Sequence, residues 1–175
     1  ASAVNDGASV AEALAAEGAK VVLCARGEAE LFAARDEIAR STGAEVEAKT
    51  ADVTVPSDIT ALVDFTLRRF GGLHILVTNA GGPPPGHFEE FSDEDWQDAW
   101  NLNGMSAVRL IRESLAPMRK AGWGRIIAVT SIAVKEPVES LVLSNSVRAS
   151  VHGLIKTLSR QVAGEGITSN IVMPG

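Results

Sequence analysis

The chain has 175 residues, 46% of them hydrophobic, with a formal net charge of −6; this suits one domain with its own core and excludes a mainly disordered state. Its apolar runs are shorter than a membrane span requires, and its cations are scattered among acids, which argues against membrane and nucleic-acid partners. The first ten residues show no secretory signal, so we expect a soluble, cytoplasmic protein that binds a small molecule.

Helices and strands are predicted to alternate along the chain. Helical periodicity predicts amphipathic helices over residues 7–17, 28–41, 56–70, 92–120 and 145–163. Short apolar runs rich in β-branched residues predict strands over residues 20–25, 44–53, 73–78, 124–130 and 168–173. Pro56 suits the first position of its helix, and Ser92 with Asp95 forms a capping box at the start of the next.

This alternation predicts an α/β fold with a doubly wound, mostly parallel, Rossmann-like sheet. In such a sheet the ligand site lies at the carboxyl ends of the strands, where the loop GGPPPG (residues 81–86) is placed to wall a crevice. No internal linker is visible, so residues 1–175 are expected to form a single dinucleotide-binding domain. We expect a first strand before residue 1 and a substrate-selecting segment after residue 175, because the central strand of the pattern is otherwise absent or reduced to ASAV.

Six motifs follow one another in the order EGAKVVLCAR, ADVT, TNAGG, NLNG, GRIIAVTS and SNIVMPG. In sequence and spacing they resemble the short-chain dehydrogenase/reductase family, and the resemblance covers nearly the whole chain. Each motif alone is a weak signal, whereas six in this order on the expected strand ends are a strong one. The resemblance implies an oxidoreductase with a nicotinamide cofactor.

The resemblance also assigns a cofactor site. The family's glycine turn corresponds to Ala1, Asn5 and Gly7, of which only Gly7 is still a glycine; a turn that no longer holds a dinucleotide is the alternative. Arg26, after the neutral Ala25, suits the extra phosphate of NADP(H), with a plain surface arginine as the alternative. The other expected cofactor contacts are Asp52 and Val53 at the adenine, Asn79, Ala80, Gly81, Pro174 and Gly175. A loop or helix-capping role for Asp52 and a purely structural turn at Asn79–Gly81 remain alternatives.

The catalytic positions depart from the family's pattern. Ser131 matches the serine that bonds the substrate carbonyl, and Asn101 matches the helix asparagine, with a solvent-facing side chain as the alternative. Ser144 and Arg148 stand where the family has tyrosine and lysine, and the chain contains no tyrosine at all. A serine hydroxyl is a far weaker acid than a phenol and has a shorter reach, while arginine keeps the positive charge but does not give up a proton. The motif LSNSVR resembles an atypical branch of the family.

Two hypotheses follow from these positions. In the first, the protein reduces a carbonyl with NADP(H), as a 3-oxoacyl carrier-protein reductase does: Ser131 and Ser144 bond the oxygen, Arg148 stabilises negative charge, and water or another residue supplies the proton. In the second, it is a catalytically silent nucleotide-binding or scaffold subunit. The resemblance also implies a homo-oligomer, a dimer or tetramer. No residues show metal-ligand spacing, so no metal is expected.

Overall fold

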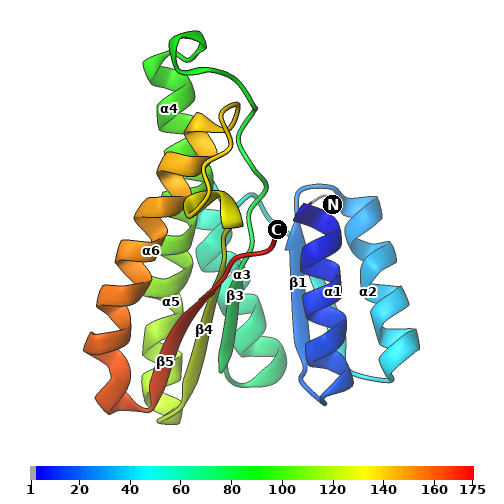
Figure 1. The fold of residues 1–175 in the computed structure, drawn as a ribbon. Helices are drawn as coiled ribbons and strands as arrows, with labels where there is room; N and C mark the ends of the chain where they lie inside the picture. The colour runs from blue at the N-terminus through cyan, green and yellow to red at the C-terminus, as the bar shows by residue number, and fades with distance from the viewer. Residues whose placement is uncertain (1–2) are drawn as a thin grey trace. The chain divides into compact units, whose positions relative to one another are not determined.

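The computed structural model describes the backbone of residues 3–175 and the side chains from residue 7 onward. The chain divides into two compact units, Ala1–Gly71 and Gly72–Gly175 (Figure 1). Each unit alternates helices with parallel strands, which confirms the predicted α/β class. The single domain over residues 1–175 stays a prediction.

The first unit is built on a pair of parallel strands. Its elements are α1 (Ala3–Ala16), β1 (Val21–Ala25), α2 (Glu28–Thr42), β2 (Val46–Thr50) and α3 (Pro56–Phe70). β1 and β2 pair in register from Val21↔Val46 to Ala25↔Thr50, so their carboxyl ends lie together. Both α2 and α3 end at a glycine in the left-handed region, Gly43 with φ 72° and Gly71 with φ 77°, a conformation that other residues rarely adopt.

Helix α1 differs from the expectation at its start. It begins at Ala3, so Gly7 lies inside the helix rather than in a turn before it, and the predicted turn at Gly7 is wrong. The physical reason is that residues 3–6 contain neither proline nor glycine to interrupt helical hydrogen bonding. Ala1 and the side chain of Asn5 lie outside the described residues. The cofactor role of Gly7 stays a prediction.

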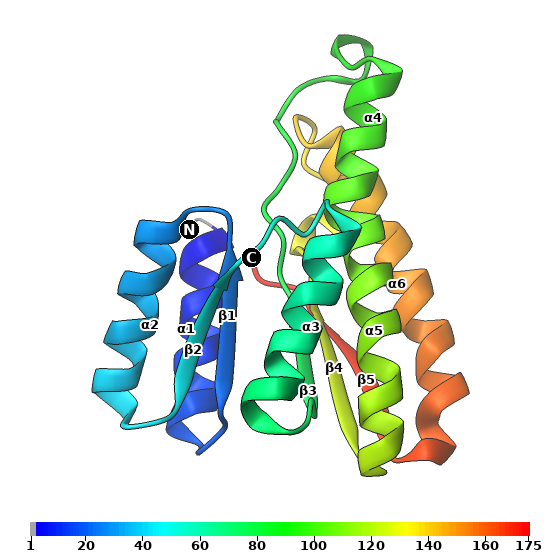
Figure 2. The ribbon, with the colours of Figure 1, turned by 180° about the vertical axis from the view of Figure 1, so that it is seen from behind.

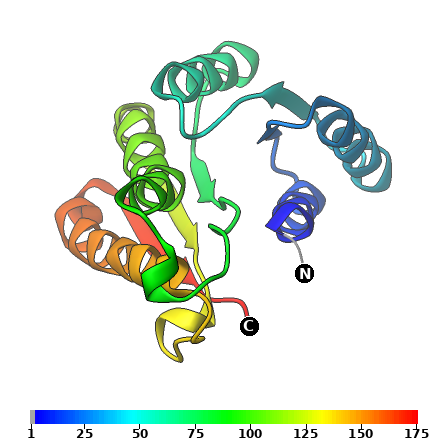
Figure 3. The ribbon, with the colours of Figure 1, turned by 90° about the horizontal axis from the view of Figure 1, so that it is seen from above.

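The second unit carries a parallel sheet of order β3-β4-β5. The strands are β3 (Ile75–Thr78), β4 (Gly124–Val129) and β5 (Ile167–Val172), and the longest helices are α5 (Ser106–Ala121) and α6 (Val142–Val162). These two helices lie on the same face of the sheet (Figures 2 and 3). Burial along β4 alternates accordingly, with Ile126 and Ala128 fully buried and Ile127 half-buried between them.

The remaining elements of this unit are short. They are η1 (Phe88–Glu90), α4 (Asp93–Ala99), the π-helical η2 (Trp100–Met105), η3 (Ile132–Val134) and η4 (Ala163–Glu165). The Ser92 hydroxyl accepts a hydrogen bond from the Asp95 amide, and the Asp95 carboxylate accepts one from the Ser92 amide, which confirms the capping box. The helix predicted over residues 92–120 is interrupted by η2, a π-helical turn that contains Gly104.

Candidate functional site

The carboxyl ends of β4 and β5 lie side by side in the second unit. The Thr130 amide donates to the Val172 carbonyl at 2.9 Å, and the Ile132 amide donates to the Pro174 carbonyl at 3.0 Å. These bonds continue the contact of the two strands beyond their last paired residues, Val129 and Val172. The structure therefore brings Ser131, Pro174 and, through the chain, Gly175 to one edge of the sheet.

Ser131 is half-buried at this edge, and its hydroxyl can still donate a hydrogen bond. Its Oγ accepts from the Ala133 amide at 3.1 Å, which caps η3. This contact uses a lone pair of the hydroxyl, so the hydroxyl hydrogen remains able to donate. The geometry thus suits a residue that bonds an incoming carbonyl oxygen.

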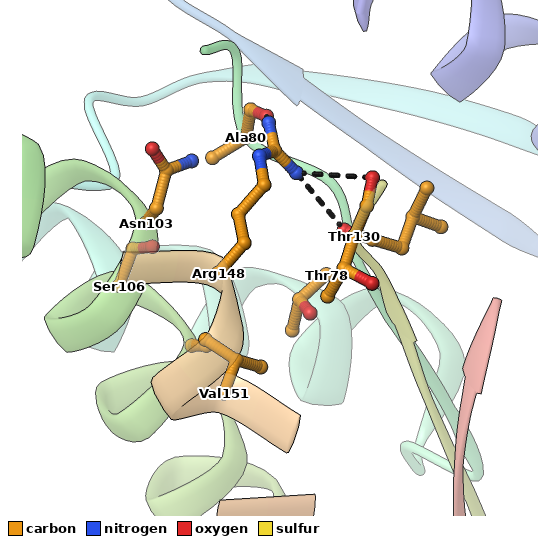
Figure 4. A pocket seen from close by; sticks show the side chains of 9 residues that line it. Thr78, Ala80, Asn103, Ser106, Thr130, Arg148 and Val151 are labelled. Carbon is orange, nitrogen blue, oxygen red and sulfur yellow. Dashed lines mark hydrogen bonds between the residues drawn. The ribbon is translucent and has the colours of Figure 1, made fainter. Parts of the chain in front are cut away.

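Arg148 projects from α6 toward the carboxyl ends of β3 and β4 (Figure 4). It is 9% exposed, and burial lowers the pKa of its guanidinium. Nη2 donates to the Ala80 carbonyl at 3.1 Å, and Nη1 donates to the Thr130 carbonyl at 3.2 Å and to the Val129 carbonyl at 3.5 Å. Most of its donors are therefore engaged with backbone oxygens inside the unit.

Ser144 is buried with Arg148. Its side chain is 7% exposed, and its Oγ accepts from Arg148 Nε at 3.1 Å. Both residues lie on one face of α6, one helical turn apart. A short side chain held in this position lacks the reach that a tyrosine ring would give, so direct contact between Ser144 and a substrate oxygen is not supported.

Asn103, which the sequence analysis missed, reaches the loop after β3 with its side-chain amide. Asn103 is 7% exposed and its Nδ2 donates to the Gly81 carbonyl at 2.8 Å, whereas Asn101 is half-buried. Within the described part of the chain, the buried Asn103 Oδ1 has no hydrogen-bond donor. The signal was present, since the motif NLNG holds two asparagines, but the choice between them depends on the π-helical turn.

The π-helical turn η2 is fitted around a glycine. A Cβ built on Gly104 would lie 2.8 Å from Cε3 of the Trp100 ring, closer than real side chains approach. The Ser106 hydroxyl donates to the Leu102 carbonyl at the end of the turn. Gly104 therefore permits the close approach of Trp100 that accompanies the inward placement of Asn103.

A cavity of about 20 Å³ lies among these side chains (Figure 4). Its lining includes Thr78, Ala80, Asn103, Ser106, Thr130 and Arg148. Ligand pockets commonly occupy several hundred Å³, so this cavity holds neither a dinucleotide nor a substrate. It is a small gap among the ends of β3 and β4, the turn η2 and the helices α5 and α6.

In the first unit, Arg26 and Asp52 follow the carboxyl ends of β1 and β2. Asp52 Oδ1 accepts from Thr54 Oγ1 at 2.7 Å and from the Thr54 amide at 2.9 Å. These two bonds, and less strongly the charge of Arg26, lower the pKa of Asp52. Arg26 is exposed and Val53 is half-buried. The structure thus brings Arg26 and Asp52 close together and also gives Asp52 the loop-stabilising contacts considered as its alternative role.

The remaining predictions concern the two units separately. Gly7 and Arg26 belong to the first unit, and Asn79 and Ser131 to the second; their convergence at one site stays a prediction. Among the described residues, no group of three or more His, Cys, Asp or Glu side chains could hold a metal ion. No described helix has both the length and the apolar character needed to cross a membrane.

Residues 7–175 match the short chain dehydrogenase family. The chain belongs to the short-chain dehydrogenase/reductase family. It is 36% identical over 172 residues to D-beta-hydroxybutyrate dehydrogenase of Rhizobium meliloti (97% of this chain, 66% of the relative). It is 34% identical over 169 residues to 3-oxoacyl-(acyl-carrier-protein) reductase FabG of Escherichia coli (97% of this chain, 68% of the relative).

The fold is also that of solved structures in this family. L-sorbose reductase from Gluconobacter frateurii, complexed with NADPH and L-sorbose, superposes with a TM-score of 0.93 at 34% identity, over 99% of this chain and 65% of that chain. The Rossmann-like fold is therefore confirmed. The chain spans about two thirds of the length of these proteins, 66% of the Rhizobium meliloti dehydrogenase.

Proposed function

We propose that the whole protein is an NADP(H)-dependent oxidoreductase that reduces the carbonyl of a small molecule, with a 3-oxoacyl thioester as the first substrate class to test. The observation that carries the proposal is Ser131: it is half-buried at the carboxyl end of β4, and its hydroxyl hydrogen is able to donate. The names of the relatives support the substrate class, since one is a 3-oxoacyl-(acyl-carrier-protein) reductase.

The residues after β1 and β2 fit an NADP(H) adenosine. Arg26 is exposed and follows the neutral Ala25, so its guanidinium can bind a phosphate without a competing carboxylate at position 25. Asp52 has a lowered pKa and is ionised near neutral pH, which suits an acceptor for an amine hydrogen. The NADPH bound to L-sorbose reductase supports this choice of cofactor. When bound, NADPH supplies the hydride.

We assign the chemical step to Ser131, which donates a hydrogen bond to the carbonyl oxygen as negative charge develops there. The proton that completes the alcohol comes from solvent, because Ser144 is buried and Arg148 retains its proton. On this reading the chain belongs to an atypical branch in which Ser144 and Arg148 replace tyrosine and lysine. Asn103, the second asparagine of the motif NLNG, supports the loop after β3 through its bond to the Gly81 carbonyl.

The expected partners follow from the same family membership. A homo-oligomer, dimer or tetramer, is proposed from the resemblance of the long helices α5 and α6 to those that associate in the family. A cytoplasmic location stays a prediction. The alternative of a silent nucleotide-binding or scaffold subunit is less well supported, since the curated relatives named above are a dehydrogenase and a reductase.

Titration of the full-length protein with NADPH tests the proposal. Binding should quench protein fluorescence, and the absorbance of the reduced nicotinamide should fall when 3-oxoacyl thioesters or simple ketones are added. Binding without turnover across that panel would support the silent subunit, and no binding would overturn the cofactor assignment. Ser131→Ala should lower kcat by roughly 100-fold or more, the usual cost of removing a hydrogen-bond donor to a developing oxyanion.

A further inference from the structure

We infer that Arg148 is a positioning residue: its guanidinium braces the loop after β3 against the end of β4 and does not contact the reacting atoms. The inference concerns the proposed active site and, for its effect on turnover, rests on the proposed function. It assigns to the Ser144–Arg148 pair a role other than proton donation or stabilisation of negative charge.

The brace lies where the two strands stop pairing. The last paired residues of β3 and β4 are Thr78 and Ala128. Ala80 and Thr130 lie two residues beyond them, and their carbonyls both accept from Arg148, at 3.1 Å and 3.2 Å. The guanidinium therefore takes the place of backbone hydrogen bonds just beyond the last paired residues of β3 and β4. It fixes the distance between the two strand ends.

The geometry of the side chain suits this task. Arginine presents its five N–H donors in a rigid plane, so one side chain can donate to carbonyls of two separate backbone segments at once. Nε is used as well, since it donates to Ser144 Oγ at 3.1 Å and thereby fixes the orientation of the plane. Lysine has three donors on a compact ammonium group and cannot span the same set of acceptors.

The loop after β3 is held at a second point. Asn103, from the π-helical turn, donates to the Gly81 carbonyl at 2.8 Å, next to the Ala80 carbonyl that Arg148 holds. Two side chains from different helices thus bind consecutive carbonyls of the segment that the family resemblance places at the cofactor. Holding both carbonyls limits the conformations of the Asn79–Gly81 backbone and so prepares it for binding.

The burial of Arg148 agrees with a brace better than with a contact to substrate. Its side chain is 9% exposed, and carbonyl dipoles surround the charge in place of a carboxylate. Each of these bonds is charge-assisted and therefore stronger than a neutral one. Turning the guanidinium toward a ligand would break them and leave buried carbonyls without donors, which is costly.

Arg148→Lys in the full-length protein tests the brace, with Arg160→Lys, an exposed arginine on the same helix, as the matched control. Amide hydrogen exchange over residues 79–82 and 130–132 should become roughly tenfold faster in Arg148→Lys and stay unchanged in Arg160→Lys. The Kd and KM for NADPH should rise roughly tenfold. With NADPH saturating, kcat should stay within about threefold of the wild type, because the reacting atoms keep their contacts.

Unchanged exchange in Arg148→Lys would overturn the brace, whether or not the protein turns over any substrate. A kcat loss of roughly 100-fold with unchanged exchange and unchanged KM would instead place the guanidinium at the reacting atoms. If the wild type neither binds NADPH nor consumes it, the proposed function fails, and the exchange experiment still decides the brace. Should Arg148→Lys not fold, Ser144→Ala removes only the Nε acceptor and should accelerate exchange over the same segments by roughly threefold; no change would count against the brace.

Discussion

The side-chain amide of Asn103 donates to the backbone carbonyl of Gly81 at 2.8 Å, across 22 residues of sequence. The bond joins the π-helical turn η2 to the loop that follows β3. Asn101, two positions earlier in the same motif, is half-buried instead. The sequence motif therefore points to Asn101, whereas the structure places Asn103 against the loop after β3.

Asn103→Ala should destabilise the protein more than Asn101→Ala. The first change leaves the Gly81 carbonyl without its donor, which costs about 1–3 kcal/mol in the free energy of unfolding, whereas the second should cost less than about 1 kcal/mol. Urea denaturation measures both values, and NADPH titration should show weaker binding for Asn103→Ala only. A larger loss of stability in Asn101→Ala would instead support Asn101, the asparagine that the motif indicated.

Gly104→Ala should strain the π-helical turn. The new Cβ would lie 2.8 Å from Cε3 and 3.0 Å from Cδ2 of Trp100, atoms near the base of the ring that cannot move aside cheaply. Overpacking of this kind costs about 1–3 kcal/mol. In a double-mutant cycle, Trp100→Ala should remove most of the cost of Gly104→Ala, because the two residues share one contact. Additive losses would mean that the strain arises elsewhere.

His152 should make stability depend on pH. Its Nε2 lies 2.9 Å from Thr130 Oγ1, and burial, followed by the charge of Lys135, lowers its pKa. Because the folded state resists protonation, the stabilisation is fully present above the unfolded pKa of about 6.5 and is lost as pH falls through the folded value. The melting temperature of His152→Gln should therefore fall less between about pH 8 and about pH 5 than that of the wild type. Identical pH profiles would contradict this account.

Arg26→Ala should change the preference between cofactors. A charge-assisted hydrogen bond contributes about 1.5–3 kcal/mol, so NADPH binding should weaken by roughly ten- to 100-fold, while NADH binding changes little. Arg40→Ala, which removes an exposed arginine from α2 in the same unit, is the control. Equal losses for NADPH and NADH would show that Arg26 does not bind the extra phosphate.

Features that depend on local sequence were predicted well. Helix α3 begins at Pro56 and ends before Gly71, because proline suits the first helical position and glycine accepts the left-handed conformation after the last. The capping box of Ser92 and Asp95 likewise needs only its own residues. Parallel pairing was also predicted, since a helix between two strands is the usual crossover connection of parallel strands.

Features that depend on distant contacts were not predictable in this way. The π-helical turn holds Asn103 inward, and the bond of this side chain to the Gly81 carbonyl joins it to a loop 22 residues away. The direction of Arg148 depends on the Ala80 carbonyl, 68 residues away. Charge and spacing could place this arginine near the site, but only the folded backbone determines which acceptors surround it.

Transfer of deuterium from NADPH deuterated at the reactive carbon of its nicotinamide tests the central claim most directly. Incubated with the full-length protein and a 3-oxoacyl thioester or ketone, the labelled cofactor should give an alcohol that carries one deuterium on the former carbonyl carbon, seen by mass spectrometry. Ser131→Ala should reduce the labelled product by roughly 100-fold. An absence of deuterated alcohol across the substrate panel, with NADPH bound, would contradict the assignment of this protein as a carbonyl reductase.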